Sequence, residues 1–170
     1  MSRLMTEVRD EQAADVHAIR DVNRQAFGQE HEGRIVDALR DNGAATLSMV
    51  AVVDGHVVGH IMFSPATVGP VLGAALGPMA VVPARQREGI GSQLVTHGLE
   101  RLRARACPFV VVIGHPRFYP RFRFLPAVSL GLTCDWDVPA EVFMVQVLTP
   151  TITDRLRGKV EYRAEFVMSE

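Results

Sequence analysis

The chain has 170 residues, of which 48% are hydrophobic and 22% charged, and its formal net charge is −1. This length suits one ordinary domain, and the composition is that of a globular protein rather than a disordered one. A chain so close to neutrality has no general electrostatic attraction to nucleic acids or anionic membranes, so we expect neither as a partner.

The N-terminus lacks the apolar core of a secretory signal, and no stretch approaches the length of a membrane span. Cys107 and Cys134 are widely spaced in apolar or aromatic surroundings, which predicts buried free thiols rather than a disulfide or a zinc site. His56 and His60 lie in a strand-like segment and are weak support for a metal site. We therefore expect a cytoplasmic protein without a metal.

The N-terminal third predicts one strand followed by two helices. The strand covers 6–9 and has the character of an edge strand. Asp10 or Asp15 can cap the first helix, and Gly28 ends it. The second helix runs from about 32 to 40 and stops before 42–43. The apolar positions that support the two helices are Val16, Ile19, Val22 and Phe27 in the first and Ile35, Val36 and Leu39 in the second.

The signal then becomes that of a β-sheet. Asp54-Gly55 separates two apolar, β-branched runs at 47–53 and 56–64, which predicts an antiparallel hairpin with a type I′ turn. We expect a loop over 65–73 and a third strand over 75–82.

A helix and a covered strand come next. Residues 89–104 carry Ile90, Leu94, Val95, Leu99 and Leu102 at helical spacing. The continuous apolar run at 109–113 is typical of a strand covered on both faces, and a strand, helix, strand order predicts a parallel pair.

The remaining residues predict further strands at 128–133 and 142–148 and a last edge strand over 158–166. The chain therefore reads as a single domain, 1–170, with a core at about 5–150. The fold class is α/β, with a mixed sheet of six or seven strands flanked by helices.

A glycine-rich turn at 86–91 links the third strand to the third helix. The first turn of a helix leaves backbone N–H groups unpaired and carries the positive end of the helix dipole, so such a turn can hold a phosphate group. Gly89 and Gly91 would let a diphosphate approach the backbone, and Arg85 and Arg87 add positive charge. The same turn could also have only a structural role. The chain lacks the Lys-Ser/Thr ending of a P-loop and does not complete the three-glycine dinucleotide motif.

The pattern Val81-x-Pro83-x-x-Gln86-x-x-Gly89-Ile90-Gly91 resembles the coenzyme-A-binding motif of the GCN5-related N-acetyltransferases. The resemblance implies the acyl-CoA N-acyltransferase fold of that family, with the turn amides on the pyrophosphate of acetyl-CoA and the preceding strand along the pantetheine arm. The cofactor-binding residues that it implies are Met79, Ala80, Val81, Gln86, Arg87, Glu88, Gly89, Ile90, Gly91, Ser92 and His115.

A second element follows the covered strand. Tyr119 and Phe124 match the Tyr-x-x-x-Gly-Phe of the same family, and the whole segment 114–124 is similar to that of a YhbS-like branch. Arg123 stands where the family has glycine, so this turn either does not need a positive φ or has been reshaped. His115 stands where an asparagine often contacts the cofactor.

The resemblance also implies roles in catalysis. Tyr119 would act as the general acid, because a phenol is no more acidic than a thiol and can protonate a departing thiolate. The oxyanion donor would be the backbone N–H of Val81. The general base stays open among Glu30, His31, Glu32, His115 and a water chain. Arg117, Arg121 and Arg123 could meet a phosphate, an acidic acceptor or only solvent.

We therefore expect an acetyl-CoA-dependent N-acetyltransferase that moves an acetyl group to a primary amine of a small molecule or peptide by direct attack in a ternary complex. The alternative is a non-catalytic acyl-CoA-binding sensor or scaffold, and a nucleotide-binding turn is a weaker third possibility. A homodimer is a further expectation, because edge strands need a partner or a cover.

Overall fold

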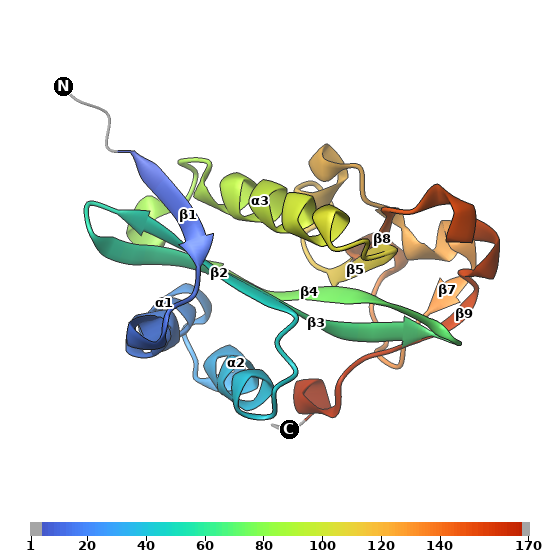
Figure 1. The fold of residues 1–170 in the computed structure, drawn as a ribbon, viewed down its shortest axis with the longest axis horizontal. Helices are drawn as coiled ribbons and strands as arrows, with labels where there is room; N and C mark the ends of the chain where they lie inside the picture. The colour runs from blue at the N-terminus through green and yellow to red at the C-terminus, as the bar shows by residue number, and fades with distance from the viewer. Residues whose placement is uncertain (1–4, 168–170) are drawn as a thin grey trace.

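The structure is a computed structural model and describes residues 5–167. An open sheet forms its centre, with α3 on one face and α1 and α2 on the other (Figure 1). The helices are α1 (Val16–Phe27), α2 (His31–Asp41) and α3 (Ile90–Ala104), and the strands are β1 (Thr6–Asp10), β2 (Leu47–Val53), β3 (His56–Val68), β4 (Val71–Val81), β5 (Phe109–Ile113), β6 (Leu125–Pro126), β7 (Leu132–Thr133), β8 (Phe143–Val147) and β9 (Gly158–Glu161).

The sheet is mixed, as predicted. Its strand order is β1-β2-β3-β4-β5-β8-β6, and β9 pairs with the far end of β3 and with β7. β4 and β5 form the predicted parallel pair, whereas the other neighbours along the main path are antiparallel. The Asp54-Gly55 hairpin is confirmed, with φ of 51° and 75° at its two central residues.

The loop predicted over 65–73 is wrong. β3 continues to Val68 and turns directly into β4, so that Pro65 pairs with Ala74 inside a ladder. β2 pairs with β3 only as far as Phe63, so one edge of β3 is open at Pro65. A proline is tolerated there because its missing N–H costs no ladder hydrogen bond on that side.

Two C-terminal strands are shorter than predicted. The run at 128–133 is a 3₁₀ turn, Ala127–Leu130, followed by the two-residue β7. The edge strand expected to reach 166 ends at Glu161, and Ala164–Val167 forms another 3₁₀ turn. Glu165 accounts for this break, because its buried carboxylate accepts hydrogen bonds from Arg163 and from Asn42 after α2.

The core has one cluster on each face of the sheet. The five predicted apolar residues of α3 pack on Leu47, Met49 and Ala51 of β2. Ile19, Ile35, Val36 and Leu39 from α1 and α2 pack on Val50 and Met62, which point the opposite way. A further cluster on that second face joins β5 and β8 to the C-terminal segments.

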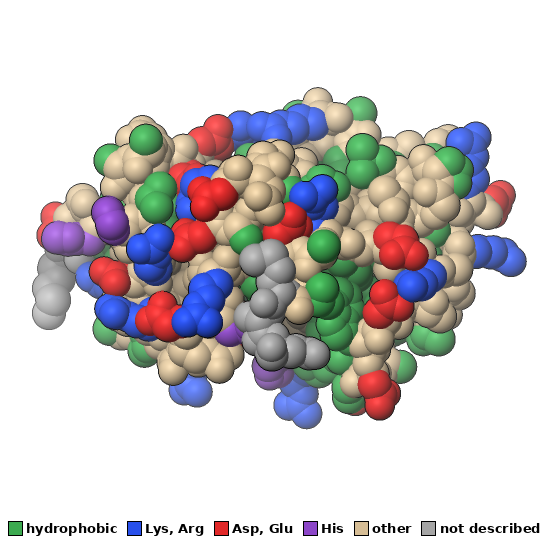
Figure 2. Space-filling model, turned by 90° about the horizontal axis from the view of Figure 1, so that it is seen from below, with side chains coloured by type: hydrophobic (Ala, Val, Ile, Leu, Met, Phe, Trp, Pro, Cys, Tyr) green, Lys and Arg blue, Asp and Glu red, His purple; other side chains and the backbone are tan. Residues whose placement is uncertain are grey.

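The surface on the α1–α2 side mixes charges of both signs, with hydrophobic side chains gathered right of centre (Figure 2). Cys107 and Cys134 are free thiols, half-buried rather than fully buried. None of the helices within residues 5–167 has the length and hydrophobicity needed to cross a lipid bilayer.

Candidate active site

A gap opens where β4 and β5 separate. The two strands pair from Ala74 and Val110 only to Leu76 and Val112. Beyond that point β4 carries an extra residue relative to β3, because Leu76 pairs with Phe63 and Met79 with Ile61. The parallel ladder is therefore interrupted beside the last residues of β4.

The backbone of β4 faces this gap. Val82 N donates to Val58 O on β3 at 2.9 Å. Because successive N–H groups of a strand point in opposite directions, the N–H of Val81 faces away from β3 and toward the gap. This is the geometry that a backbone oxyanion donor or an added ligand strand requires.

The glycine turn at 86–91 lies at the end of the gap where β4 ends and α3 begins. Gly89 adopts φ of 82° and precedes α3, and the first helical hydrogen bond joins Gln93 N to Gly89 O at 3.1 Å. The amides of Ile90, Gly91 and Ser92 consequently have no partner within the helix. Gln86 ties the turn to the strand, since its Nε2 donates to Val81 O at 3.0 Å.

Arg87 also has a positive φ, 68°, which the sequence did not reveal. Gly91, by contrast, needs no positive φ. A Cβ at Gly91 would lie 3.5 Å from Phe118 and 3.7 Å from Met79, so a larger side chain there would occupy the gap.

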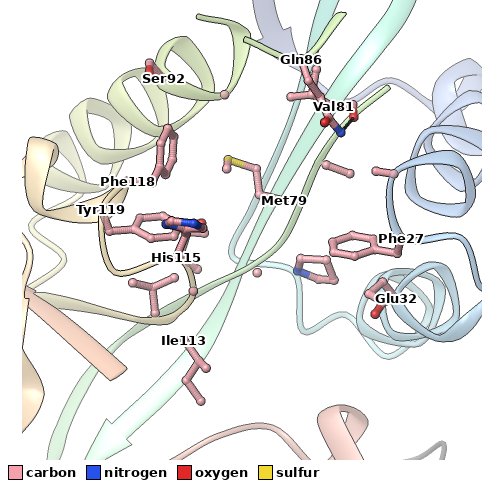
Figure 3. Close-up of a pocket in the computed structure, with 18 of the residues that line it drawn as sticks. Phe27, Glu32, Met79, Val81, Gln86, Ser92, Ile113, His115, Phe118 and Tyr119 are labelled. Atoms are coloured by element: carbon pink, nitrogen blue, oxygen red, sulfur yellow. Dashed lines mark hydrogen bonds between the residues drawn. The ribbon is translucent and has the colours of Figure 1, made fainter. Parts of the chain in front are cut away.

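A cavity of about 1030 Å³ occupies the gap and is lined by residues from both sides of the sheet. Figure 3 shows Tyr119, Phe118 and His115 on one side of β4 and Phe27 and Glu32 on the other. The cavity is lined by ten of the eleven residues that we predicted to bind the cofactor, namely Met79, Ala80, Val81, Gln86, Arg87, Gly89, Ile90, Gly91, Ser92 and His115. Glu88 does not line it and forms an ion pair with Arg85 at 3.6 Å.

Tyr119 opens a 3₁₀ turn, Tyr119–Phe122, and its buried ring lines the cavity. Phe118 and Phe124 hold the ring edge-on, with centroids 5.0 and 5.6 Å away. Burial raises the pKa of Tyr119, so its hydroxyl stays protonated at neutral pH. Among the described residues the hydroxyl has no hydrogen-bond partner, which leaves its proton available to a ligand.

Gly114 is needed for this placement, and the sequence did not single it out. A Cβ at Gly114 would lie 2.4 Å from Cε2 of Tyr119, a separation that real side chains do not adopt. The signal in the sequence that could have identified Gly114 was its position directly after the covered strand.

The candidate bases divide by position. His31, Glu32 and His115 line the cavity, whereas Glu30 does not. Glu32 accepts a hydrogen bond from Gln29 Nε2 at 2.9 Å. His115 Nδ1 accepts the backbone N–H of Arg117 at 3.3 Å.

The turn at Arg123, where the family motif has glycine, has not been reshaped. The φ of Arg123 is 71°, so the turn keeps the left-handed conformation that glycine adopts most easily. Of the three arginines in this segment, Arg121 lines the cavity, with its guanidinium 4.8 Å from the centroid of the Phe118 ring.

The far wall of the cavity, on the α1–α2 face of the sheet, was not predicted from the sequence. Phe27 and Ile35 read as helix core, and the C-terminal contributors gave no local signal. The residues added on this side are Phe27, Ile35, Ile113, Trp136, Val138, Tyr162 and Phe166. No group of three or more His, Cys, Asp or Glu side chains within residues 5–167 could hold a metal ion.

The gap, the free helix amides and the open strand edge fit a ligand with a diphosphate and an extended amide-bearing arm, as acetyl-CoA has. Comparisons with known proteins agree. Residues 13–121 match the acetyltransferase (GNAT) family. The uncharacterized N-acetyltransferase YjhQ of Escherichia coli K12 is 36% identical over 157 residues, which cover 85% of this chain and 87% of YjhQ.

Two solved structures are similar along nearly the whole chain. The N-acetyltransferase YhbS of Escherichia coli, in complex with CoA, has a TM-score of 0.94 at 31% identity and covers 100% of this chain and 96% of its own. An acetyltransferase of Brucella melitensis, in complex with acetyl-CoA, has a TM-score of 0.81 at 37% identity and covers 95% of this chain and 98% of its own. This chain therefore belongs to the GNAT family of acetyltransferases.

Proposed function

We propose that this protein transfers an acetyl group from acetyl-CoA to a primary amine by direct attack within a ternary complex. The observation that carries the proposal is the cavity that passes through the sheet where β4 and β5 separate, with the amino end of α3 at one side. Such a channel lets two substrates enter from opposite faces and meet at the strand edge.

The residues at the α3 side would hold acetyl-CoA. The amides of Ile90, Gly91 and Ser92 and the dipole of a 15-residue helix favour a diphosphate. Met79 and Val81 offer backbone groups along the open edge of β4 to the pantetheine arm. The co-substrate brings an activated thioester, so the protein itself needs no nucleophilic residue.

Two groups would serve the chemical step. The N–H of Val81 donates to the oxyanion that forms when the amine attacks the carbonyl carbon. Tyr119 donates its proton to the departing thiolate as the carbon–sulfur bond breaks, and the amine loses a proton to solvent or to a base on the far wall. Because burial raises the pKa of Tyr119, the residue begins the step as an acid.

The test is release of free thiol from acetyl-CoA in the presence of a panel of primary amines. We expect Tyr119→Phe to lower kcat by about tenfold to a hundredfold while the KM for acetyl-CoA changes little, because only the proton donor is lost. Unchanged kcat would remove the acid role from Tyr119. Tight binding of acetyl-CoA without thiol release for any amine would favour the non-catalytic sensor instead.

A further inference from the structure

We infer that the acceptor is a monoamine with an apolar body: one primary amine, a hydrophobic group and no anionic group. This inference rests on the proposed function and concerns the cavity wall on the α1–α2 face. That wall differs in chemistry from the α3 side, where the arginines gather.

The wall is built from apolar side chains on one face of the sheet. Val138 and Tyr162 pack on the cluster of Phe109 and Val111, and Phe166 packs on the cluster under α1 and α2. Both clusters lie opposite α3. An aromatic row follows the wall, because the rings of Trp136 and Tyr162 are 4.7 Å apart and those of Tyr162 and Phe166 are 5.7 Å apart.

Two large apolar residues of this wall remain open to solvent. Phe27, the last residue of α1, is 40% exposed, and Ile113, the last residue of β5, is 38% exposed. Both line the cavity. An apolar ligand that covers them is stabilised by the removal of this apolar surface from water.

Charge on the wall excludes several acceptor classes. The arginines that line the cavity are Arg85, Arg87 and Arg121. Arg85 ends the 3₁₀ turn before the glycine turn, Arg87 lies in the glycine turn, and Arg121 lies in the turn beside Phe118. On the α1–α2 face no described lining residue is Lys or Arg. A carboxylate or phosphate on the acceptor would be dehydrated there without a lysine or arginine to compensate it.

One carboxylate is present, and it suits one ammonium group. Glu32 is the single acidic residue among the described residues that line the cavity. It can attract a cationic amine to the wall, but a polyamine or an aminoglycoside carries several charges and needs several carboxylates. Acidic amino acids, phosphorylated amino sugars and polycations are therefore poor acceptors on this account.

The direct test is thiol release from acetyl-CoA with n-alkylamines from ethylamine to n-hexylamine. These amines have nearly the same basicity, so differences between them report contact with the wall. We expect kcat/KM for the amine to rise by about twofold to fourfold for each added methylene until the wall is filled. 2-Phenylethylamine should exceed spermidine, L-glutamate and glucosamine 6-phosphate by at least about tenfold.

Paired variants locate the effect. Phe27→Ala should lower kcat/KM for 2-phenylethylamine about tenfold and leave the KM for acetyl-CoA unchanged. Leu72→Ala is the control, because Leu72 is 59% exposed on β4 and does not line the cavity. Glu32→Gln should raise the KM for the amine, whereas Glu30→Gln, two residues away and outside the cavity, should not.

Three results would overturn the inference. Preference for L-glutamate, glucosamine 6-phosphate or spermidine would contradict the acceptor class while leaving acetyl transfer intact. A rate that rises with the acyl chain, from acetyl-CoA to hexanoyl-CoA, but not with the amine would assign the wall to the thioester. Failure of every amine despite binding of acetyl-CoA would defeat the proposed function itself and the inference with it.

Discussion

The buried histidine of β3 makes acid stability a sharp test of the structure. His60 is fully buried between α1 and β2. Its Nδ1 lies 3.4 Å from Asn23 Nδ2, and its Nε2 lies 2.9 Å from Ser48 Oγ. An amide nitrogen can only donate, so Nδ1 accepts and Nε2 carries the proton of a neutral ring. Ser48 Oγ donates in turn to Glu11 Oε1 at 3.2 Å.

Burial, followed by the positive charge of Arg40, lowers the pKa of His60 to about 3. Because the folded pKa lies below the unfolded value of 6.5, the unfolded state binds the proton more tightly. Stability is therefore complete above the unfolded pKa and is lost as the pH falls toward the folded pKa. Linkage gives a loss of about 2 kcal/mol from pH 7 to pH 5 and about 3 kcal/mol from pH 7 to pH 4.

The assay is urea unfolding at several pH values between 7 and 5. We expect wild type and the exposed-site control His56→Gln to share the same fall in the free energy of unfolding, and His60→Gln to lose most of that fall. Asp15, whose pKa is lowered mainly by its hydrogen bonds with Arg9, contributes at lower pH and does not confuse the comparison. Equal slopes in wild type and His60→Gln, or a His60 ring that titrates above pH 5 in the folded protein, would refute this reasoning.

The remaining predictions concern the turn after Tyr119 and one glycine in each of α2 and α3. Arg123→Gly should raise the free energy of unfolding by about 0.5–1 kcal/mol. The reason is that removing the steric strain of a non-glycine residue at φ 71° outweighs the added entropy of the unfolded chain. An unchanged or lower melting temperature of the variant would contradict this prediction. Gly98→Ala should destabilise α3 by about 1–2 kcal/mol in the same assay, since its Cβ would lie 2.5 Å from the Phe63 ring. The matched change is Gly33→Ala in α2, where the atom nearest to the new Cβ is 3.8 Å away, and it should stabilise the protein by up to about 1 kcal/mol. Equal changes in stability for the two variants would show that packing around the new methyl group does not determine the effect.

Local patterns in the sequence were sufficient for most of the fold. The helical spacing in α3, the Asp54-Gly55 turn and the apolar run of β5 each predict one element from a few neighbouring residues, and the structure has all three. The cofactor side of the cavity follows for the same reason, because the glycine turn and its helix are contiguous in the chain.

The acceptor side could not be predicted in this way. Phe27 and Phe166 are 139 positions apart, and each reads as a core residue because helical or alternating spacing does not distinguish a core from a cavity wall. Glu32 lies in the first turn of α2 and lines the cavity, whereas Glu30 precedes the helix and does not. The prediction of a C-terminal strand reaching residue 166 was wrong because Glu165 accepts hydrogen bonds from Arg163 and from Asn42, which follows α2, and this contact outweighs the alternating pattern.

Calorimetric titration with acetyl-CoA tests the central claim most directly, with wild type, Gly91→Glu and the control Thr96→Glu compared side by side. Gly91 lines the cavity and has no unusual φ, so a glutamate there adds bulk and negative charge to the gap without straining the backbone. Thr96 carries the same new charge on the exposed face of α3. We predict that wild type and Thr96→Glu bind and that Gly91→Glu binds at least about tenfold more weakly. No binding by folded wild-type protein, or equal affinity in all three, would contradict the account.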